Sequence, residues 1–270
     1  MSMFGSRYGP WALVAGASEG LGAEFAREIA RRGVNVILVA RRREALARTA
    51  GAIAGVEVRT LVLDLAAANA AGAVAQAVRD VEVGLLVYNA AFSPIGPFLD
   101  RPVEDHMRTI QVDCTAMMCL VHEIGRTMRQ RGRGGILVMS SMAGLQGTAL
   151  VGNYAATKAY ARVLAEGLWE ELRGHGVDVL ACCAGPTGTP GYLGSLPERP
   201  GFRPPVLDPA TVASEALDGL GRGPVMVPGL TNRLAALFID HLLSTRGAVR
   251  IMGRTMRSIY GAPASAPHRA

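Results

Sequence analysis

The amino-acid sequence predicts a doubly wound α/β fold, in which one parallel sheet carries helices on both faces. Short apolar runs alternate with longer stretches of helical periodicity along most of the 270 residues. The runs are apolar at successive positions instead of at every second one, which is typical of strands buried on both faces. The sequence contains no internal repeat and no linker that would divide it. We therefore expect one such domain over residues 10–228.

Each element follows from its local pattern. The apolar runs predict strands over 11–15, 34–40, 56–63, 84–89, 135–139, 177–183 and 224–227. Amphipathic or alanine-rich stretches predict helices over 21–32, 42–53, 66–80, 102–131, 153–173 and 208–220. Residues 184–209 are rich in Pro and Gly and too long for a simple turn, which indicates a functional loop over a site. Residues 229–270 follow the last strand and predict a basic helical extension.

The composition excludes several classes of function. The net charge is +6, but the arginines are dispersed and only 5% of residues are aromatic, so we expect no nucleic-acid partner. No apolar run reaches the roughly 20 residues of a membrane span, and the N-terminus lacks the apolar core of a secretory signal, which predicts a cytoplasmic protein. Neither the cysteines (Cys114, Cys119, Cys182 and Cys183) nor the scattered histidines have the spacing of ligands, so we expect no metal.

Residues 16–22 form a glycine-rich segment directly after the first strand, at the start of the first helix. Gly16, Gly20 and Gly22 would let the backbone approach a diphosphate, which the helix N-terminus and Ser18 of the same turn could bind. The spacing Gly-x-x-x-Gly-x-Gly differs from the commoner Gly-x-Gly-x-x-Gly fingerprint of dinucleotide sites. Taken alone, the segment is equally compatible with a purely structural turn.

Three consecutive arginines follow the second strand, where an NAD-selective site would place an acid for the ribose 2′-hydroxyl. Positive charge at the start of a helix opposes the helix dipole, so Arg41, Arg42 and Arg43 are locally unfavourable. A bound 2′-phosphate would offset that cost, which indicates NADP(H) as the cofactor, with Arg41 and Arg42 as its ligands. The alternative is a solvated basic turn that Glu44 partly neutralises.

Lys158 is the single lysine among 28 basic residues. A position that keeps lysine in so arginine-rich a chain should need a compact ammonium instead of a planar guanidinium. Tyr154 lies four residues earlier in a helical pattern, so the two side chains share one face. A free tyrosine has a pKa of about 10, and an ammonium roughly 4 Å away would stabilise a phenolate by about 4 kcal/mol at an effective dielectric constant of about 20. This pair is therefore a candidate acid/base.

In this order, the motifs resemble those of the short-chain dehydrogenases/reductases over roughly residues 10–228, which implies a Rossmann-like fold. Gly16, Gly20 and Gly22 look like the family's cofactor glycines. The resemblance extends to Asp64 with Leu65 as the adenine contact, Asn89 beyond the fourth strand, and Gly185, Pro186, Thr187 and Thr189 as the loop that holds the nicotinamide amide. Ser141 has the family's spacing to Tyr154.

The resemblance also implies roles. Ser141 would hydrogen-bond the substrate oxygen, Tyr154 would transfer a proton to it, and Lys158 would hold the ribose hydroxyls. The chain departs from the family at Asp113, where an asparagine usually supports a water chain to the lysine. An aspartate can accept from water but cannot donate an amide N–H, so Asp113 is either a modified relay residue or a helix-face acid with no catalytic part.

We expect an oxidoreductase that transfers a hydride between NADP(H) and a carbonyl/alcohol pair, with reduction as the favoured direction. Apolar side chains of two loops predict an apolar substrate, such as a lipid-like, acyl, terpenoid or aromatic ketone: Met142, Leu145, Ala149, Leu150 and Val151 in the first loop, and Tyr192, Leu193, Leu196 and Phe202 in the second. These side chains could instead simply pack the loops. A non-catalytic NADPH-binding sensor or interaction protein is the alternative class of function, and turnover on any ketone would separate the two.

Two expectations concern surfaces. The helices over 102–131 and 153–173 carry more apolar surface than one sheet face requires, and the family commonly pairs these helices between subunits, which implies a homodimer or homotetramer. In the extension, an apolar stripe recurs at helical spacing: Leu230, Leu234, Leu237, Phe238, His241 and Leu242. We expect this stripe to dock on the domain or on a neighbouring subunit. A membrane-surface contact, helped by Arg246, Arg250, Arg254 and Arg257, is the less favoured alternative.

Overall fold

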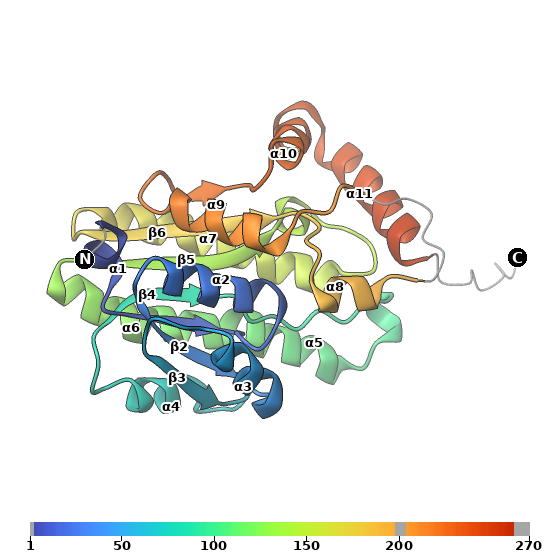
Figure 1. The fold of residues 1–270 in the computed structure, drawn as a ribbon. Helices are drawn as coiled ribbons and strands as arrows, with labels where there is room; N and C mark the ends of the chain where they lie inside the picture. Colours follow the sequence, from blue (N-terminus) through green and yellow to red (C-terminus); the bar gives the residue numbers. More distant parts are fainter. Residues whose placement is uncertain (1–2, 198–203, 262–270) are drawn as a thin grey trace, which may run out of the picture.

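A computed structural model describes residues 3–197 and 204–261. In this part of the chain, seven parallel strands form one sheet in the order β3-β2-β1-β4-β5-β6-β7 (Figure 1). The strands are β1 (Trp11–Ala15), β2 (Asn35–Ala40), β3 (Val58–Val62), β4 (Val83–Tyr88), β5 (Gly134–Ser141), β6 (Val177–Ala184) and β7 (Val225–Met226). The order reverses between β1 and β4, and ligands of such sheets bind beyond the carboxyl ends of the strands at that point. The predicted fold class is confirmed.

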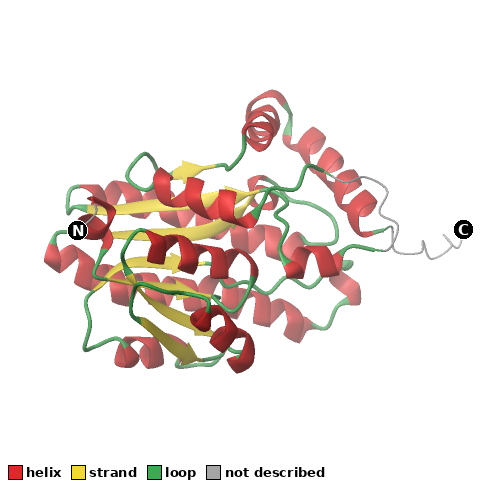
Figure 2. Cartoon of the chain, in the orientation of Figure 1, coloured by secondary structure: helices red, strands yellow, loops and turns green. Residues whose placement is uncertain are grey.

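Helices cover both faces of the sheet (Figure 2), because alternate strand residues point into two separate cores. Leu13 packs with α4 (Ala70–Ala77), α6 (Met117–Arg131) and α7 (Gly152–Arg173). Its neighbours Ala12 and Val14 pack on the other face with α1 (Met3–Tyr8), α2 (Gly20–Arg31), α3 (Arg43–Gly51) and α9 (Pro209–Gly219). Buried on both sides, the strands have the continuous apolar sequences from which they were expected.

The helix expected over 102–131 is interrupted. It consists of α5 (Val103–Ile110), a π-helical turn (Gln111–Ala116) and α6. The Tyr88 hydroxyl of β4 donates a hydrogen bond of 2.6 Å to the Val112 carbonyl. In a regular helix this carbonyl would accept a hydrogen bond from the backbone of the next turn. A group inserted into the helical hydrogen-bond ladder is a common cause of such irregularities.

The segment after β6 contains a short helix that the sequence did not predict, α8 (Pro190–Ser195). Thr189 caps it, because its Oγ1 accepts a hydrogen bond of 3.2 Å from the Tyr192 N–H, and Pro190 occupies the first turn, where it leaves no hydrogen bond unmade. Beyond β7, α10 (Leu230–Leu242) and α11 (Thr245–Tyr260) lie outside the sheet, at the upper right in Figure 1. Residues 262–270 of the expected extension lie outside the described part.

The apolar stripe of α10 does not pack on the domain, which corrects that part of our expectation, while docking on a neighbouring subunit stays a prediction. The side chain of His241 lies outside the described residues. Leu230, Leu234, Leu237, Phe238 and Leu242 are 48–73% exposed, whereas the opposite face of the helix buries Asn232 and Ala236. The small residues allow α10 to approach the body of the protein closely, so the larger side chains face outward. None of the helices in the described part of the chain combines the length and hydropathy of a membrane span.

Candidate active site

A cavity of about 870 Å³ lies at the carboxyl ends of the strands, where the strand order reverses. Its walls come from the turns after β1, β2, β3, β4, β5 and β6, and also from α8, α10 and α11. Most of the residues expected to bind cofactor or substrate meet here, although they are spread over more than 170 positions of the sequence.

The glycine-rich turn forms one end of the cavity, where Gly16, Ser18 and Gly20 line it. Gly16 has a φ of +84°, and a Cβ there would lie 2.7 Å from the backbone of Ala90. Gly22 does not line the cavity; a Cβ at this position would lie 2.0 Å from the Gly16 carbonyl oxygen. Gly22 therefore allows the turn to close, while Gly16 and Gly20 present backbone to the cavity.

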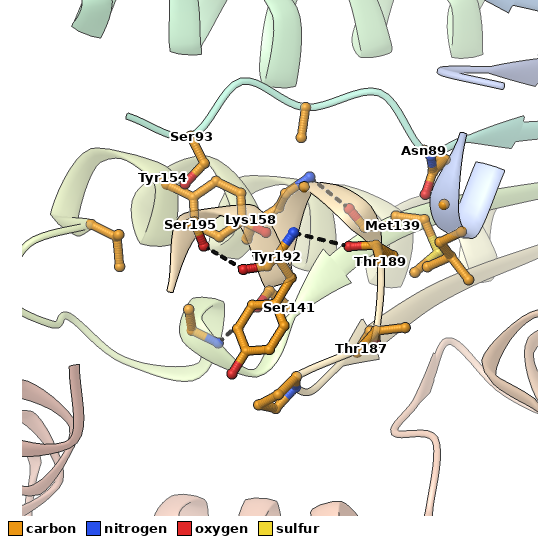
Figure 3. A pocket seen from close by; sticks show the side chains of 18 of the residues that line it. Asn89, Ser93, Met139, Ser141, Tyr154, Lys158, Thr187, Thr189, Tyr192 and Ser195 are labelled. Carbon is orange, nitrogen blue, oxygen red and sulfur yellow. Dashed lines mark hydrogen bonds between the residues drawn. The ribbon is translucent and has the colours of Figure 1, made fainter. Parts of the chain in front are cut away.

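Asn89 joins this turn to the end of β4. Its Nδ2 donates a hydrogen bond of 3.0 Å to the Gly16 carbonyl, and its side chain also lines the cavity (Figure 3). This hydrogen bond from Asn89, at the end of the neighbouring strand, fixes the position of the turn. Such a cradle of backbone at a helix N-terminus fits a dinucleotide diphosphate.

Arg41 and Arg42 also line this end of the cavity, at the end of β2. The Arg42 guanidinium donates a hydrogen bond of 3.2 Å to Ser18 Oγ and lies 2.6 Å from the Glu19 carboxylate. Arg43 begins α3 and is exposed outside the cavity wall. Two of the three consecutive arginines are therefore placed to contact an anionic group beside the glycine turn.

Asp64 and Leu65 follow β3 at the same end. The Asp64 carboxylate accepts hydrogen bonds from the Ala66 N–H (3.0 Å) and the Arg108 guanidinium (2.7 Å). Burial opposes ionisation of Asp64, but these two donors outweigh it and lower the pKa of the carboxyl. An ionised acid at this position could accept from the amino group of an adenine.

Ser141, Tyr154 and Lys158 line the cavity from β5 and α7 (Figure 3). Lys158 is 3% exposed; its Nζ donates a hydrogen bond of 3.0 Å to the Met139 carbonyl and lies 5.4 Å from the centre of the Tyr154 ring. Ser141 Oγ accepts a hydrogen bond of 3.1 Å from the Ala143 N–H. The three side chains combine a hydroxyl that can hold an oxygen, a phenol that can transfer a proton, and a fixed positive charge.

Two contacts that the sequence did not predict set α7 against the end of β5 and the turn that follows it. Ser140 Oγ donates a hydrogen bond of 2.7 Å to the Lys158 carbonyl. A Cβ on Gly144 would lie 2.7 Å from the Lys158 carbonyl carbon, so only glycine permits this approach. Both residues act through the position of Lys158 and make no contact that a motif would reveal.

Asp113 lies behind Lys158 and not in the cavity wall. It is 1% exposed, and its carboxylate accepts hydrogen bonds from the Phe92 N–H (2.7 Å) and the Thr157 hydroxyl (3.2 Å). The Lys158 ammonium lies 3.8 Å from Asp113 Oδ2. Burial raises the pKa of this carboxyl, and the lysine and the two donors limit the rise.

Gly185, Pro186, Thr187 and Thr189 line the cavity beyond β6. Thr187 Oγ1 donates a hydrogen bond of 3.0 Å to the Gly185 carbonyl, and the segment pairs with Leu207 at both Pro186 and Gly188. A Cβ on Gly185 would lie 2.5 Å from Asn232 Nδ2. Asn232 of α10, which the sequence did not indicate as a site residue, thus packs directly against this loop.

The other end of the cavity is formed mainly by apolar side chains and hydroxyls. Of the side chains expected there, Met142, Val151 and Tyr192 line the cavity, but Leu145, Ala149, Leu150, Leu193 and Leu196 do not. Phe202, also expected there, lies outside the described residues. The sequence missed the contribution of the C-terminal helices, which supply Ala235, Ile239, Met252, Thr255, Met256, Ile259 and Tyr260. Burial raises the pKa of Tyr260, which favours the neutral phenol.

Comparison with known proteins agrees with this geometry. The family model for the short chain dehydrogenase matches residues 10–194. A 7beta-hydroxysteroid dehydrogenase of Clostridium sardiniense is 33% identical over 233 residues, which cover 85% of this chain and 89% of that protein. A solved structure of a 7beta-hydroxysteroid dehydrogenase superposes with a TM-score of 0.86 at 30% identity, covering 93% of this chain and 99% of the other.

A second solved structure, a short-chain dehydrogenase from Sphingobium yanoikuyae in complex with NADPH, superposes with a TM-score of 0.75 at 31% identity. The match covers 95% of this chain and 98% of the other. The shared family accounts for the nicotinamide-cofactor cradle and for a reaction that transfers a hydride on an alcohol/carbonyl pair. The chain belongs to the short-chain dehydrogenase family.

Proposed function

We propose that this protein interconverts a bulky apolar ketone and its secondary alcohol, with NADPH as the preferred cofactor and reduction as the favoured direction. The observation that carries the proposal is the division of the cavity. Its charged lining residues in the described part of the chain are Glu19, Arg41, Arg42, Asp64 and Lys158, all at the cofactor end. The substrate end has no charged side chain among the described residues, so it favours a neutral, apolar molecule.

In the proposed mechanism, Ser141 and Tyr154 hold the substrate oxygen between their hydroxyl groups. A nicotinamide cofactor supplies or accepts the hydride when it is bound. Tyr154 donates a proton to the oxygen during reduction and takes it back during oxidation. The Lys158 ammonium stabilises negative charge on the phenol oxygen, and because it is buried its charge acts through little water. Ser141 can donate and accept as the charge on the substrate oxygen changes.

The lining residues support a substrate larger than a simple aliphatic ketone. Met142, Met252, Met256 and Ile259 provide a broad apolar wall, and methionine side chains adapt to irregular shapes. The hydroxyls of Tyr192, Ser195 and Tyr260 offer a few polar contacts for orientation. The similarity to 7beta-hydroxysteroid dehydrogenases supports a rigid polycyclic alcohol or one of similar bulk.

The preference for NADPH rests on Arg41 and Arg42, which could form charge-assisted hydrogen bonds to a 2′-phosphate. Asp64 stays ionised near the two arginines, but its carboxylate accepts hydrogen bonds from Arg108 and from the Ala66 N–H. The negative charge of Asp64 is therefore directed toward these donors and need not face the phosphate. The relative in complex with NADPH also supports this preference.

A panel of ketones, aldehydes and alcohols, followed by NADPH absorbance, tests the proposal. We expect turnover with polycyclic and aromatic ketones and little with short aliphatic ones. Tyr154→Phe should lower the rate by at least about 100-fold, since the proton donor is lost. If the protein binds NADPH but reduces no ketone in the panel, a cofactor-binding sensor is the better description.

We also propose a homodimer or homotetramer. Met118 of α6 and Tyr160 and Val163 of α7 are 39–57% exposed on the helices expected to pair between subunits. Pairing these helices between subunits would cover the apolar surface of α6 and α7 that does not pack against the sheet. Light scattering at micromolar concentration tests this, and a monomer would contradict it.

A further inference from the structure

We propose that the outer faces of α10 and α11 form a docking surface for a membrane leaflet rich in anionic lipid. The first observation is the outer stripe of α10, defined as Leu230, Leu234, Leu237, Phe238 and Leu242. These side chains are 48–73% exposed and lie on one face of a helix of 13 residues. A contiguous exposed stripe of this size marks a contact surface more often than a solvated face.

The second observation is the basic face of α11, defined as Arg246, Arg250, Arg254 and Arg257. All four are exposed, and their spacing places them on one side of the helix. Among the described residues, none of the four has a carboxylate within ion-pair distance, whereas Arg59 pairs with Asp80 and Arg233 pairs with Glu215. Asp240 is the single acidic residue between positions 229 and 261. Within the described part of the chain, the face therefore carries a local excess of positive charge that no carboxylate pairs with.

The inner faces of both helices are already occupied. Asn232 and Ile239 of α10, and Met252 and Ile259 of α11, line the cavity. The two helices are consecutive and lie at the edge of the molecule, beyond β7 and α9 (Figure 1). Their outer faces cannot turn inward without opening the cavity, and nothing in residues 3–197 and 204–261 covers the outer stripe.

A lipid surface suits this pair of faces better than a second copy of the chain. The outer stripe is one helix wide and supplies five side chains, whereas a stable protein interface uses about 20–30 residues a side. A two-fold contact through these helices would also bring two uncompensated arginine faces toward each other. Anionic headgroups complement the arginines, and apolar side chains next to them can enter the acyl boundary. The inference does not depend on the identity of the substrate.

The test is co-sedimentation with vesicles of phosphatidylcholine alone or with 30% phosphatidylglycerol. We expect binding to the anionic vesicles, little to the neutral ones, and a decrease at high salt. Arg250→Gln/Arg254→Gln/Arg257→Gln should weaken binding about 100-fold, since each arginine near an anionic surface contributes about fivefold. Leu234→Ser/Leu237→Ser/Phe238→Ser should weaken it at least about tenfold.

The matched control is Arg79→Gln/Arg129→Gln/Arg222→Gln, which removes the same charge from exposed arginines elsewhere. It should keep binding within about twofold of the wild type. Equal losses in the two arginine variants would show attraction by net charge alone and overturn the proposal. Absence of binding by the wild type would also overturn it. So would a fall in oligomer mass in the leucine variant by light scattering, which would identify the outer stripe as an interface between copies.

Discussion

The Asp113 carboxylate lies 3.8 Å from the Lys158 ammonium, and both side chains are almost completely buried. The carboxylate also accepts a hydrogen bond from the Phe92 N–H, and the single proton of the neighbouring Thr157 hydroxyl lies between Asp113 and the Tyr154 carbonyl. An asparagine whose oxygen kept the Phe92 N–H would turn its NH₂ group toward the Lys158 ammonium, which has no acceptor. In this chain Asp113 is therefore better suited to position Lys158 than to relay a proton as the usual asparagine would.

Asp113→Asn, which restores the residue usual in the family, should lower kcat instead of raising it. The amide would face donors and shift Lys158 away from Tyr154, and a displacement of about 1 Å can cost about 100-fold in rate. We expect a loss of about 10- to 100-fold in kcat, measured over a range of pH. Asp105→Asn is the control, since Asp105 of α5 pairs with Arg101 and does not contact Lys158. A pH–rate profile identical to that of the wild type would contradict the positioning role.

The stability of the protein should depend on pH through Asp113. Burial raises the pKa of this carboxyl above its usual 3.8. A carboxyl with a higher pKa in the folded state binds its proton more tightly there. Its contribution to stability is complete below the pKa that the carboxyl has in the unfolded state. The contribution is lost as the pH rises through the pKa that the carboxyl has in the folded state. The free energy of unfolding of the wild type, relative to Asp113→Asn, should therefore fall as the pH rises from about 4. Urea unfolding at several pH values measures this difference, and a rise with pH would show that the sign is wrong.

Arg41→Ala/Arg42→Ala should remove the preference for NADPH while sparing NADH. Charge-assisted hydrogen bonds to the 2′-phosphate contribute about 1.5–3 kcal/mol, so we expect a loss of about 10- to 150-fold in NADPH affinity. Fluorescence titration with both cofactors measures the change. Arg43→Ala is the matched control, because Arg43 is exposed beside the cavity but does not line it. A wild type without any preference would refute this role for the arginines.

Lys158→Arg keeps the charge but should lower turnover by at least about 100-fold. Lys158 is enclosed by the Met139 carbonyl, Asp113 and the ring of Tyr154, and a wider planar guanidinium would displace one of them. The control is Arg162→Lys, one turn further along α7, where the arginine pairs with Glu166 and does not line the cavity. It should be nearly silent. Circular dichroism checks that both variants fold, and near-normal turnover of Lys158→Arg would show that the ammonium has no special role.

The sequence predicted the sheet well because its strands are buried on both faces, so that their local composition reflects their surroundings. β1 matches its expected bounds residue for residue. Features that depend on distant contacts were not predictable in this way. The π-helical turn depends on Tyr88, 24 positions before Val112. The orientation of α10 depends on how closely Ala236 can approach the domain, and both faces of that helix are apolar enough to suggest burial.

Among the site residues, the motifs identified those that line the cofactor end, because backbone approach and charge leave a pattern in the sequence. The substrate end escaped prediction. Met252, Met256 and Tyr260 reach the cavity only because α11 folds back over the strand ends, and nothing in their spacing indicates that return. Ser140 and Gly144 were missed for a similar reason, since each acts through a backbone contact with Lys158.

The π-helical turn Gln111–Ala116 holds one residue more than an α-helix would use for the same rotation, because its hydrogen bonds run from residue i to residue i+5. Asn153 of α7 donates a hydrogen bond to the His106 carbonyl of α5, while Met117 and Leu120 of α6 pack in the core, so both flanking helices are held by neighbours. An α-helix advances by about 100° per residue. Inserting a further residue would therefore rotate α5 against α6 by about that angle, whereas removing one would let the turn close into regular α-helix with both helices near their present orientation. The extra residue is reserve length, so the fold should accept the loss of one residue from this segment more easily than the gain of one.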